Sequence, residues 1–426
     1  MIKAVGITAE YNPLHNGHVF HMRKALELSG CEAVVAAMSG CFVQRGAPAV
    51  LDKWKRTEHA LRGGADLVVE IPVFYCLGNA GQYASAGVKL LESLGAVSHI
   101  SFGSESGDMD ALARCACFIR DNRGRLEDVI LQYSRSGLSY PAARARAYEE
   151  LRKAAHLSSD RDEDEDLIKQ ELAILSSPND ILAVEYIMAS DRAIPVPVQR
   201  RGAGYNDNVD DTCEFQSASG IRDMIASGRS AAGYVPEYAA GDLAQAAGSH
   251  GLTGTAAAID DRDARLFDLV RYAVLTTPAD IIDECPSGGE GLGNLLRSEV
   301  SRAVSLNDFI LRVKSRRYTY TRISRLLMQL LLDIRRTGYP ADPCYVRVLG
   351  FNDTGRAVLA ETVRNDRASL PVITNINKEA AGLGSEARKC LELDVLASDI
   401  YALISGADMA AGSDHVRRPV YLTSSR

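Results

Sequence analysis

The chain has 426 residues, of which 46% are hydrophobic, so it can bury the cores of two or three domains. Its formal charge is 48 − 55 = −7, which excludes a basic mantle over the whole surface and confines any nucleic-acid contact to a local patch. No apolar run approaches the ~18 residues that cross a bilayer. The N-terminus lacks the features of a signal peptide, so we expect a cytoplasmic protein that does not enter a membrane.

The first hundred residues alternate short apolar runs with segments of helical spacing. Strands are predicted at 4–9, 34–38, 67–71 and 100–102, with helices at 16–29, 52–62 and 82–94. Strands separated by single helices predict a parallel sheet with right-handed crossovers. Because the strands are continuously apolar, helices should cover both faces of that sheet.

The same pattern returns near residue 179 and then changes. A helix at 179–190, a strand at 194–199 and a helix at 219–227 extend the α/β pattern to about residue 230. Helical spacing then dominates at 266–275, 306–313 and 323–334, with two short strands at 345–349 and 370–374. We therefore predict an α/β protein with a Rossmann-like parallel sheet domain at 1–230 and a mainly helical domain at 231–426.

The most specific motif follows the first strand, where a histidine pair leads directly into a helix as Leu14-His15-Asn16-Gly17-His18. Histidines three apart can face one ligand at a helix start, where free N–H groups and the helix dipole favour an anion. Gly17 has no Cβ, so phosphate can approach the backbone closely. We predict that His15 and His18 are catalytic, donating hydrogen bonds to phosphate oxygens as charge builds on the α-phosphorus.

Two other interpretations of this motif stay open. The histidines could be surface residues on an ordinary strand-to-helix turn. They could also belong to a zinc site, although no third ligand at suitable spacing is evident in the sequence. The nine cysteines offer no such site either, because the one close pair, Cys115-x-Cys117, lacks CxxC spacing. We therefore expect reduced thiols and no protein-bound metal.

A second group of polar residues follows the second strand. Gln44 and Arg45 lie where ligands bind in open α/β sheets, so they could contact phosphate, an acceptor or RNA. A solvated loop is the alternative. Lys53 and Arg56 begin the next helix, and the sequence favours a phosphate role no more than a structural one.

A third group is the stretch Ser217-Ala218-Ser219-Gly220-Ile221-Arg222. Hydroxyls at a helix start usually cap the helix. The arginine on the first turn favours a second phosphate clamp, formed by Ser219 and Arg222, over a simple cap.

Positive charge is concentrated in residues 312–336, which hold eight basic residues and one acid, 8 − 1 = +7 in a chain of −7. Two tyrosines, Tyr318 and Tyr320, interrupt this segment and could stack on unpaired bases. The alternative is a basic helix packed on acidic parts of the chain. The residues predicted to bind RNA are Lys314, Arg316, Arg317, Arg322 and Arg325.

The histidine motif and the late Ser-x-Ser-x-Ile-Arg resemble the HxGH nucleotidyltransferase superfamily. The resemblance is closer to one branch, the bacterial tRNA(Met) cytidine acetate ligase family, and covers almost the whole chain. It rests on the ordered stretches AVGITAEYNPLHNGH, MSGCFVQRGAPA, DKWKRTEHAL, GADLVVEIP, FGSESGD, SYPAARARA, SSPNDILAVEYI, RRGAGYN, KSRRYTYTRISRLL, YVRVLGFNDTGR and LELDVLASDIY.

The resemblance implies a specific reaction. Enzymes of that family couple acetate with ATP to form acetyl-adenylate. They then transfer the acetyl group to the wobble cytidine of elongator tRNA(Met), giving N4-acetylcytidine. It implies ATP and acetate as substrates, tRNA as the partner of the basic segment, and Mg²⁺ accompanying ATP. The ATP contacts that it implies are Thr8, Ala9, Glu10, Tyr11, Asn12, Pro13, Leu14, His15, Asn16, Gly17, His18, Val19, Phe20, His21, Gly103, Asn179, Arg200 and Arg201.

The chain departs from the family pattern at Leu14, Ala47, Asp180, Ala183 and Asn206. None of these positions carries a group that we expect to handle phosphate. The departures bear on the acceptor or on tRNA.

Two competing functions remain. An adenylyltransferase acting on a small phosphorylated cofactor precursor would resemble the first domain but would not need the basic segment. A non-catalytic RNA-binding module is disfavoured by the intact histidine motif and by Ser219 and Arg222.

Overall fold

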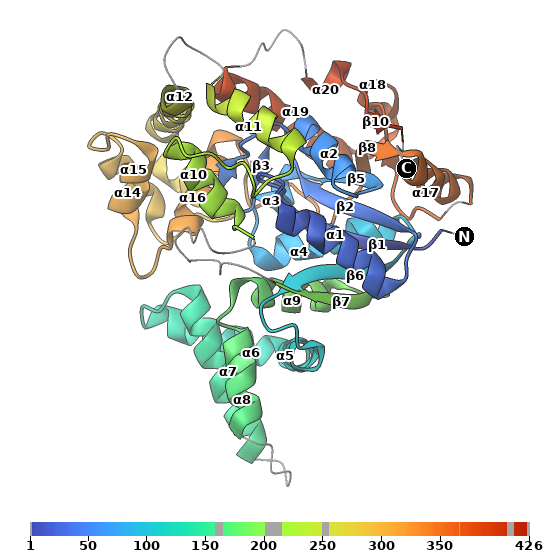
Figure 1. The fold of residues 1–426 in the computed structure, drawn as a ribbon. Coiled ribbons are helices and arrows are strands. Elements are labelled where there is room, and N and C mark those ends of the chain that lie inside the picture. The colour runs from blue at the N-terminus through green and yellow to red at the C-terminus, as the bar shows by residue number, and fades with distance from the viewer. Residues whose placement is uncertain are drawn as a thin grey trace.

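The structure is a computed structural model that describes residues 2–157, 165–200, 215–248, 255–365, 367–406 and 413–423. In this part of the chain, one sheet of eight strands forms the centre of the molecule (Figure 1), in the order β10-β8-β5-β2-β1-β6-β7 with β9 beside β8. Its strands are β1 (Ala4–Ala9), β2 (Ala33–Ser39), β5 (Leu67–Ile71), β6 (Val97–Ser104), β7 (Ile194–Gln199), β8 (Val346–Asn352), β9 (Val372–Ile373) and β10 (Val420–Leu422).

The strands predicted before residue 230 are all present and run parallel to one another. β1 lies between β2 and β6, β5 follows β2, and β7 follows β6. The predicted α/β fold class with a Rossmann-like sheet is thereby confirmed. The carboxyl ends of β1, β6 and β7 lie side by side at one edge, where an open parallel sheet places its ligands.

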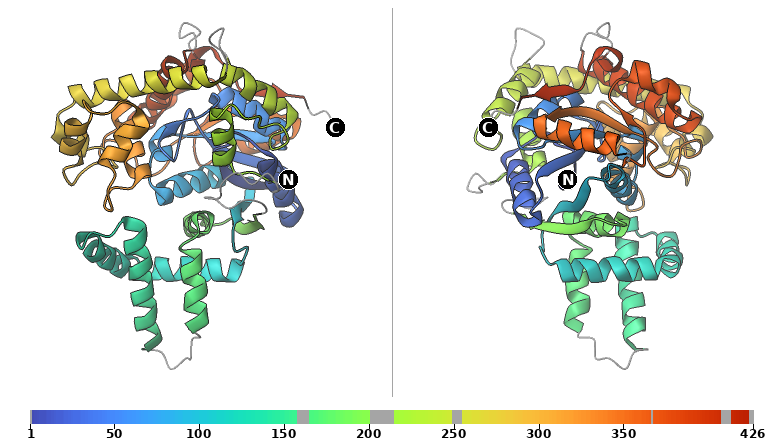
Figure 2. Two further views of the ribbon diagram at one scale, coloured as in Figure 1. Left: turned by 60° about the vertical axis from the view of Figure 1, so that its left-hand side comes forward. Right: turned by 90° about the vertical axis from the view of Figure 1, so that its right-hand side faces the viewer.

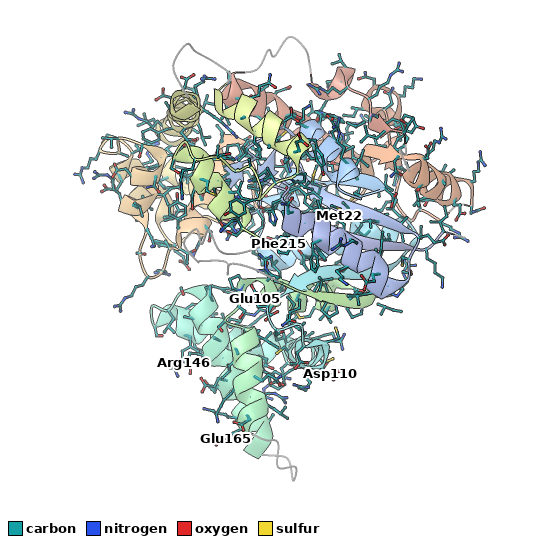
Figure 3. All side chains as sticks on the ribbon, in the orientation of Figure 1. Met22, Glu105, Asp110, Arg146, Glu165 and Phe215 are labelled. Atoms are coloured by element: carbon teal, nitrogen blue, oxygen red, sulfur yellow. The ribbon has the colours of Figure 1, made fainter. Side chains whose placement is uncertain are left out.

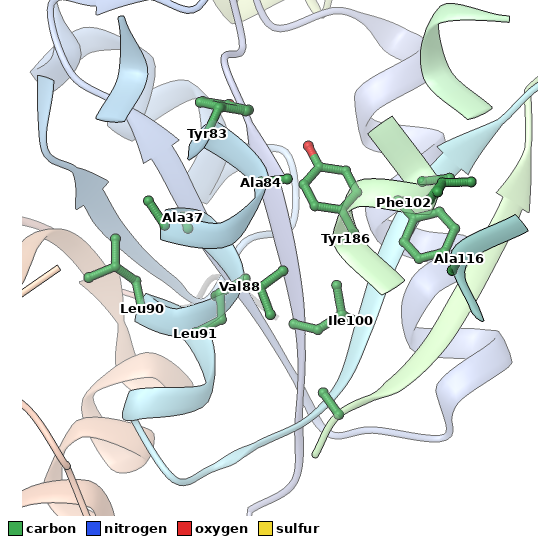
Figure 4. Packing of buried hydrophobic residues seen from close by; sticks show 14 of the residues in the cluster. Ala37, Tyr83, Ala84, Val88, Leu90, Leu91, Ile100, Phe102, Ala116 and Tyr186 are labelled. Carbon is green, nitrogen blue, oxygen red and sulfur yellow. The ribbon is translucent and has the colours of Figure 1, made fainter. Parts of the chain in front are cut away.

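Helices cover both faces of the sheet, as the apolar strands predicted. On one face of the sheet, α1 and α2 pack in one apolar core with alternate residues of β1 and β2, among them Val5 and Met38. On the other face α4 and α9 pack on the sheet, and Figure 4 shows Val88 and Leu91 of α4 beside Ile100 of β6. The helices of these layers are α1 (Asn16–Ser29), α2 (Lys53–Arg62), α3 (Val73–Cys76), α4 (Ala80–Ser93), α9 (Pro178–Ala189) and α17 (Asp353–Arg364).

A helical arm projects from the sheet between β6 and α9 (Figure 2). The apolar patterns of the sequence did not predict this arm. Its helices α7 and α8 are joined by Glu171, which accepts hydrogen bonds from Tyr148 Oη at 2.9 Å and from Arg152 Nε at 2.8 Å. The arm consists of α5 (Met109–Asp121), α6 (Arg123–Arg135), α7 (Tyr140–Leu157) and α8 (Glu165–Ile174).

Most of the chain after residue 215 is helical, as predicted. The helices α12, α14, α15, α16 and α19 enclose a second apolar core. A short hairpin, β3 (Phe42–Val43) and β4 (Ala47–Pro48), packs between this core and the sheet. The helices are α10 (Ala218–Ala226), α11 (Glu237–Gly248), α12 (Thr255–Thr276), α13 (Ala279–Asp283), α14 (Leu292–Glu299), α15 (Leu306–Val313), α16 (Tyr320–Leu331), α18 (Ile376–Glu379), α19 (Ser385–Ser405) and α20 (Ser413–Val416).

The sheet continues across the boundary predicted near residue 230. β8 pairs antiparallel with β5, and β9 and β10 pair with β8, so the last strands extend the N-terminal sheet. A short apolar run predicts a strand but does not say which edge it joins. Among the described residues, no helix is both long and apolar enough to cross a membrane.

Candidate active site

The turn between β1 and α1 carries His15 and His18, which together cap the helix. Nδ1 of His15, the N-cap residue, accepts a hydrogen bond from the backbone N–H of Gly17 at 3.1 Å. In return, the backbone N–H of His15 donates to Nδ1 of His18 at 3.2 Å. The arrangement is a reciprocal capping box in which imidazoles replace the usual hydroxyl and carboxylate.

These capping bonds determine the tautomer of both rings. A ring nitrogen that accepts from a backbone N–H carries no proton, so each neutral ring holds its proton on Nε2. The two ring centroids are 3.7 Å apart with the planes inclined by 30°. His15 and His18 therefore present two neighbouring Nε2–H donors at the positive end of the α1 dipole.

Burial keeps the histidines of this turn neutral. Burial and the charges of Arg200 and Arg222 lower the pKa of His15 to about 3. Burial, then the neighbouring His15 and Arg200, lower the pKa of His18 well below its usual range. Burial followed by Arg200 lowers the pKa of His21 to about 4. His18 and His21 are half-buried because one side of each ring faces a cleft while protein surrounds the rest.

The cleft has a volume of about 250 Å³ and opens at the carboxyl ends of β1, β6 and β7. It brings together many of the residues predicted to bind ATP. Those that line it are Thr8, Ala9, Glu10, Tyr11, Asn12, His15, Gly17, His18, Phe20, His21, Gly103, Asn179, Arg200 and Ser219. The predicted residues that lie outside its wall are Pro13, Leu14, Asn16, Val19 and Arg222. Arg201 lies outside the described residues, as does Asn206.

Three of the residues outside the wall support the turn from behind. Arg222 Nη1 donates to the carbonyl oxygen of Asn12 at 2.6 Å, and Asn16 Nδ2 donates to the carbonyl oxygen of Gly233 at 2.8 Å. Leu14 has no exposed surface and packs in the core under α1. Arg222 thus reaches the site through the backbone of the histidine turn.

The two serines at the start of α10 have different roles. Ser217 caps the helix by accepting from the N–H of Gly220 at 3.1 Å. Ser219 Oγ accepts from Arg45 Nη1 at 3.4 Å, and both of these residues line the cleft. The stretch therefore provides a cap at Ser217 and a polar wall at Ser219.

The β3–β4 hairpin closes one side of the cleft and links it to the C-terminal helices. The Gln44 N–H donates to Glu10 Oε1 at 2.9 Å, and Gln44 lines the cleft. Two residues further on, the carbonyl oxygen of Gly46 accepts from Ser324 Oγ of α16 at 2.7 Å. The hairpin thus places the start of α16 close to the cleft rim.

The opposite wall is held by a reciprocal pair of acids at the ends of β6 and α9. Glu105 accepts from Asn179 Nδ2 at 2.5 Å and from the Asp180 N–H at 2.9 Å. Asp180 in turn accepts from the Glu105 N–H at 3.0 Å and from Ser104 Oγ. Asn179 Oδ1 accepts from Arg200 Nη1 at 3.4 Å. Figure 3 shows Glu105 at the junction of the sheet and the arm, so the arm's root also orients this wall.

The remaining residues of the cleft lining were not predicted from the sequence. They come from the inner faces of α4 and α9, from the strand ends and from the start of α10, and most of them resemble ordinary core residues in the sequence. Two of them could have been predicted from their neighbours in the sequence, because Phe102 precedes Gly103 and Gln199 precedes Arg200. The unpredicted lining residues are Ile7, Tyr83, Phe102, Leu182, Tyr186, Val198, Gln199, Phe215, Gln216, Ser217 and Ala218.

Three hydroxyl groups of the cleft lining are buried without a hydrogen-bond partner in the described part of the chain, on Thr8, Tyr11 and Tyr83. Thr8 is pressed against α4, where a Cβ at Gly87 would meet its Oγ1 at 2.5 Å. Burial raises the pKa of Tyr83 well above its usual range, so its hydroxyl stays protonated and can donate. A buried hydroxyl without a partner costs about 1–3 kcal/mol, which a bound polar ligand can recover.

Lys53 and Arg56 do not face the cleft, because neither side chain has exposed surface. Lys53 Nζ pairs with Glu70 Oε1 at 2.9 Å and with Asp414 Oδ2 at 2.7 Å. Arg347 Nη1 bonds the same two acids at 3.0 and 2.8 Å, which ties β8 to β5. The suggestion that Lys53 contacts phosphate is therefore wrong.

Arg56 supports the strand ends from below. Its Nη1 donates to the carbonyl oxygen of Glu10 at 2.7 Å and to that of Ser39 at 3.0 Å, and its Nη2 donates to Gly40. The guanidinium thus joins the ends of β1 and β2. A direct phosphate contact by Arg56 is also wrong, and its role is to position the backbone of Glu10.

The basic segment is less uniform than its composition suggested. Lys314 and Arg316 are exposed, and neither has an acidic partner within the described ranges. Arg317 Nε lies 2.8 Å from Glu290 Oε2, and Arg322 Nη1 lies 3.5 Å from the same atom. Two of the predicted RNA contacts are thus already engaged with an acid of the same chain.

The remaining aromatic and basic residues of this segment differ in exposure. Tyr318 is buried and its hydroxyl donates to the Glu290 carbonyl at 2.8 Å, so it is not presented for stacking. Tyr320 is 37% exposed. Burial, then the charge of Arg322, lowers the pKa of Arg325 to about 10, because Arg325 packs beside the hairpin. Of the residues predicted to contact RNA, Lys314, Arg316 and Tyr320 are therefore the exposed ones that pair with no acid among the described residues.

Within the described residues, no group of three or more His, Cys, Asp or Glu side chains could hold a metal ion. The site therefore offers hydrogen-bond donors, arginines and one carboxylate around a cleft. Such an arrangement can bind a phosphate-bearing ligand at a helix N-terminus and stabilise charge on its phosphorus.

The fold and this site define a nucleotidyltransferase of the HIGH class, and the HIGH Nucleotidyl Transferase family matches residues 2–414. The tRNA(Met) cytidine acetate ligase of Clostridium perfringens is 34% identical over 424 residues, covering 97% of this chain and 98% of its own. The enzyme of the same name from Listeria monocytogenes is 33% identical, with 97% and 98% covered. The chain belongs to the tRNA(Met) cytidine acetate ligase family.

Solved structures agree with this assignment along the whole chain. Thermotoga maritima TmcAL bound with alpha-thio ATP superposes with a TM-score of 0.84 and 27% identity, covering 99% of this chain and 100% of that one. The apo form of the same enzyme gives a TM-score of 0.86 with 28% identity, again over 99% and 100%.

Proposed function

We propose that this protein is an ATP-dependent ligase that joins acetate to the wobble cytidine of elongator tRNA(Met). In the first step, acetate and ATP form acetyl-adenylate and pyrophosphate. In the second, the acetyl group moves to the exocyclic amine of the cytidine, giving N4-acetylcytidine and AMP. The observation that carries this proposal is the histidine cap of α1, which presents two neutral donors to a cleft at the strand ends.

The first step needs alignment and charge stabilisation more than a protein nucleophile, because acetate itself attacks. A carboxylate oxygen of acetate bonds to the α-phosphorus as the bond to the bridging oxygen of pyrophosphate breaks. The Nε2–H groups of His15 and His18 would donate to the non-bridging α-phosphate oxygens as their negative charge grows. Arg200 and Arg45 on the two walls would hold the leaving pyrophosphate or the nucleotide.

The adenine and acetate would occupy different parts of the cleft. The apolar wall of Phe102, Tyr186 and Val198 suits a purine ring. The buried hydroxyls of Thr8 and Tyr83 suit the acetate, because a carboxylate accepts hydrogen bonds and each hydroxyl has one to donate.

Mg²⁺ would enter with the nucleotide as part of the substrate. Phosphate oxygens and water are ligands that Mg²⁺ prefers, and they would carry most of its coordination. The residues before about 230 would then supply the ATP site, and the exposed basic residues near α16 would contact the tRNA backbone. We retain Lys314 and Arg316 as the leading tRNA contacts, with Arg317, Arg322 and Arg325 in supporting positions.

Exchange of labelled pyrophosphate into ATP tests the first step, because formation of a mixed anhydride is reversible. Acetate should drive this exchange without any tRNA. Pyrophosphate exchange that does not depend on acetate and instead requires nicotinate mononucleotide or phosphopantetheine would identify a cofactor adenylyltransferase and contradict the proposal.

A further inference from the structure

Glu10 is the one carboxylate among the described residues that line the cleft. It stands at the end of β1, directly before the histidine turn. Its carbonyl oxygen is held by Arg56 Nη1 at 2.7 Å, and its Oε1 accepts from the Gln44 N–H at 2.9 Å. Both its backbone and one carboxylate oxygen are therefore fixed, while the side chain is half-buried at the cleft wall.

A fixed carboxylate is an unexpected group in a cleft for a polyanionic nucleotide, since its charge repels phosphate. Burial raises the pKa of both Tyr83 and Tyr186, which extend from α4 and α9, and the charge of nearby Glu10 adds to both shifts. Figure 4 shows these two tyrosines at the same end of the sheet. Glu10 thus lies near Tyr83, whose hydroxyl is proposed to bind the acetate, and near Tyr186 on the wall proposed for the adenine.

His15 and His18 cannot serve as the base for the second step. In both rings, Nδ1 is occupied by a backbone N–H and Nε2 carries the proton, so neither neutral ring has a nitrogen ready to accept another. His21 is engaged through Nε2, which lies 3.0 Å from Ser101 Oγ. Glu10 is the one anionic base among the described residues that line the cleft.

We propose that Glu10 is the general base of acetyl transfer and recognises the exocyclic amine of the target cytosine. This inference rests on the proposed function, because it assigns a residue to its second step. A carboxylate that accepts a hydrogen bond from cytosine N4 is an established mode of base recognition, and uracil lacks that donor.

The N4 nitrogen forms a bond to the carbonyl carbon of acetyl-adenylate, and the bond from that carbon to the phosphate oxygen breaks. One N4 proton passes to Glu10 Oε2, so that AMP leaves as an anion and the carboxylate becomes a neutral acid. The acid then returns its proton to solvent. The amine needs this help because its lone pair is delocalised into the pyrimidine ring.

The test separates the two half-reactions in Glu10→Gln and Glu10→Asp. Glutamine keeps an oxygen that can accept from Gln44, while it removes the base. The Kd for tRNA should stay within about threefold of the parent protein. Because Glu10 also belongs to the predicted ATP site, acetate-dependent exchange of pyrophosphate is measured alongside, and any loss of exchange should be far smaller than the loss of transfer. Single-turnover transfer from enzyme-bound acetyl-adenylate to tRNA should fall by ~10²-fold or more in Glu10→Gln. The transfer rate of Glu10→Asp should lie between those of the parent protein and Glu10→Gln, because the carboxylate remains but the shorter side chain holds it farther back.

Glu165→Gln, exposed on the distant arm (Figure 3), is the matched control and should change neither half-reaction.

Three results would decide against this role. Transfer within threefold of the parent in Glu10→Gln would show that no proton passes to this residue. A parallel loss of exchange would place the carboxylate in the first step, for instance on Mg²⁺. Transfer in Glu10→Asp no better than in Glu10→Gln would show that the charge is not what matters. Absence of acetate-dependent exchange in the parent protein would instead overturn the proposed function itself.

Discussion

The backbone N–H of His15 donates to Nδ1 of His18 at 3.2 Å, so the first histidine of the motif orients the ring of the second. This contact joins helix capping to chemistry, since the bond that closes the helix also directs a protonated Nε2 toward the cleft. Substitutions of His15 or His18 should therefore affect both the stability of the helix and the chemistry at the cleft.

His18→Ala should lower acetate-dependent exchange by ~10²-fold or more, because it removes one donor to the α-phosphate in the transition state. It should also reduce the free energy of unfolding by about 0.5–2 kcal/mol, because the helix loses part of its cap. Exchange kinetics and urea unfolding on the same preparation measure both effects. Near-normal exchange would remove His18 from the mechanism.

Stability should depend on pH through the buried histidines. In the folded protein, the pKa values of His15 and His21 are about 3 and about 4, below the value of an unfolded histidine. At a pH between the folded and the unfolded pKa values, the unfolded chain therefore binds more protons than the folded protein does. Stability is therefore complete above about pH 6.5 and falls as the pH drops through this window. Asparagine at position 15 can still cap the helix but does not titrate. In His15→Asn, the loss between about pH 6 and about pH 5 should shrink by up to ~1.4 kcal/mol. An unchanged slope in urea unfolding would mean that His15 titrates normally in the folded protein.

Tyr83→Phe should weaken acetate binding specifically. The hydroxyl is buried, protonated and without a partner in the described structure, and a hydrogen bond to a charged group contributes about 1.5–3 kcal/mol. The KM for acetate should therefore rise by about tenfold or more, while the KM for ATP stays unchanged. Tyr133→Phe, on the arm, removes a hydroxyl that bonds Glu150 and serves as the control. Equal KM values for acetate in Tyr83→Phe and the parent would move the acetate elsewhere.

Charge reversal at Lys314 and Arg316 should separate RNA binding from catalysis. Both side chains are exposed, so their loss leaves the helical core and the cleft intact. The Kd for tRNA should rise, and its salt dependence should flatten by roughly one unit of slope per lost contact, while acetate-dependent exchange survives. Arg364 and Lys378 are exposed on α17 and α18, across the molecule from α15 (Figure 1), and their reversal is the control. Binding that weakens equally in both pairs would place the tRNA on another surface.

The sequence predicted the elements of the sheet well, because buried strands and single helices produce clear apolar patterns. It missed the arm, whose helices bury small apolar stripes between charged residues such as Arg152 and Glu171. It could not place β8 beside β5, because that pairing depends on a buried ion cluster formed by residues up to 361 positions apart.

The candidate site was predictable where a motif carried it and not elsewhere. The histidine turn and Asn179 came from recognisable stretches, and the cleft brings them together. The sequence did not identify Tyr83 and Tyr186 as site residues. A tyrosine on the core face of a helix looks like any core residue until the structure shows how its hydroxyl is placed. For Lys53 and Arg56 the sequence left both roles open, because positive charge near the strand ends can brace the backbone as readily as it binds phosphate.

The most direct measurement is incubation of the protein with ATP, isotopically labelled acetate and total tRNA, followed by nucleoside mass spectrometry of the recovered RNA. The account predicts labelled N4-acetylcytidine that requires ATP, disappears in His18→Ala, and maps to the wobble position of elongator tRNA(Met). Consumption of ATP without labelled N4-acetylcytidine in any tRNA would contradict it.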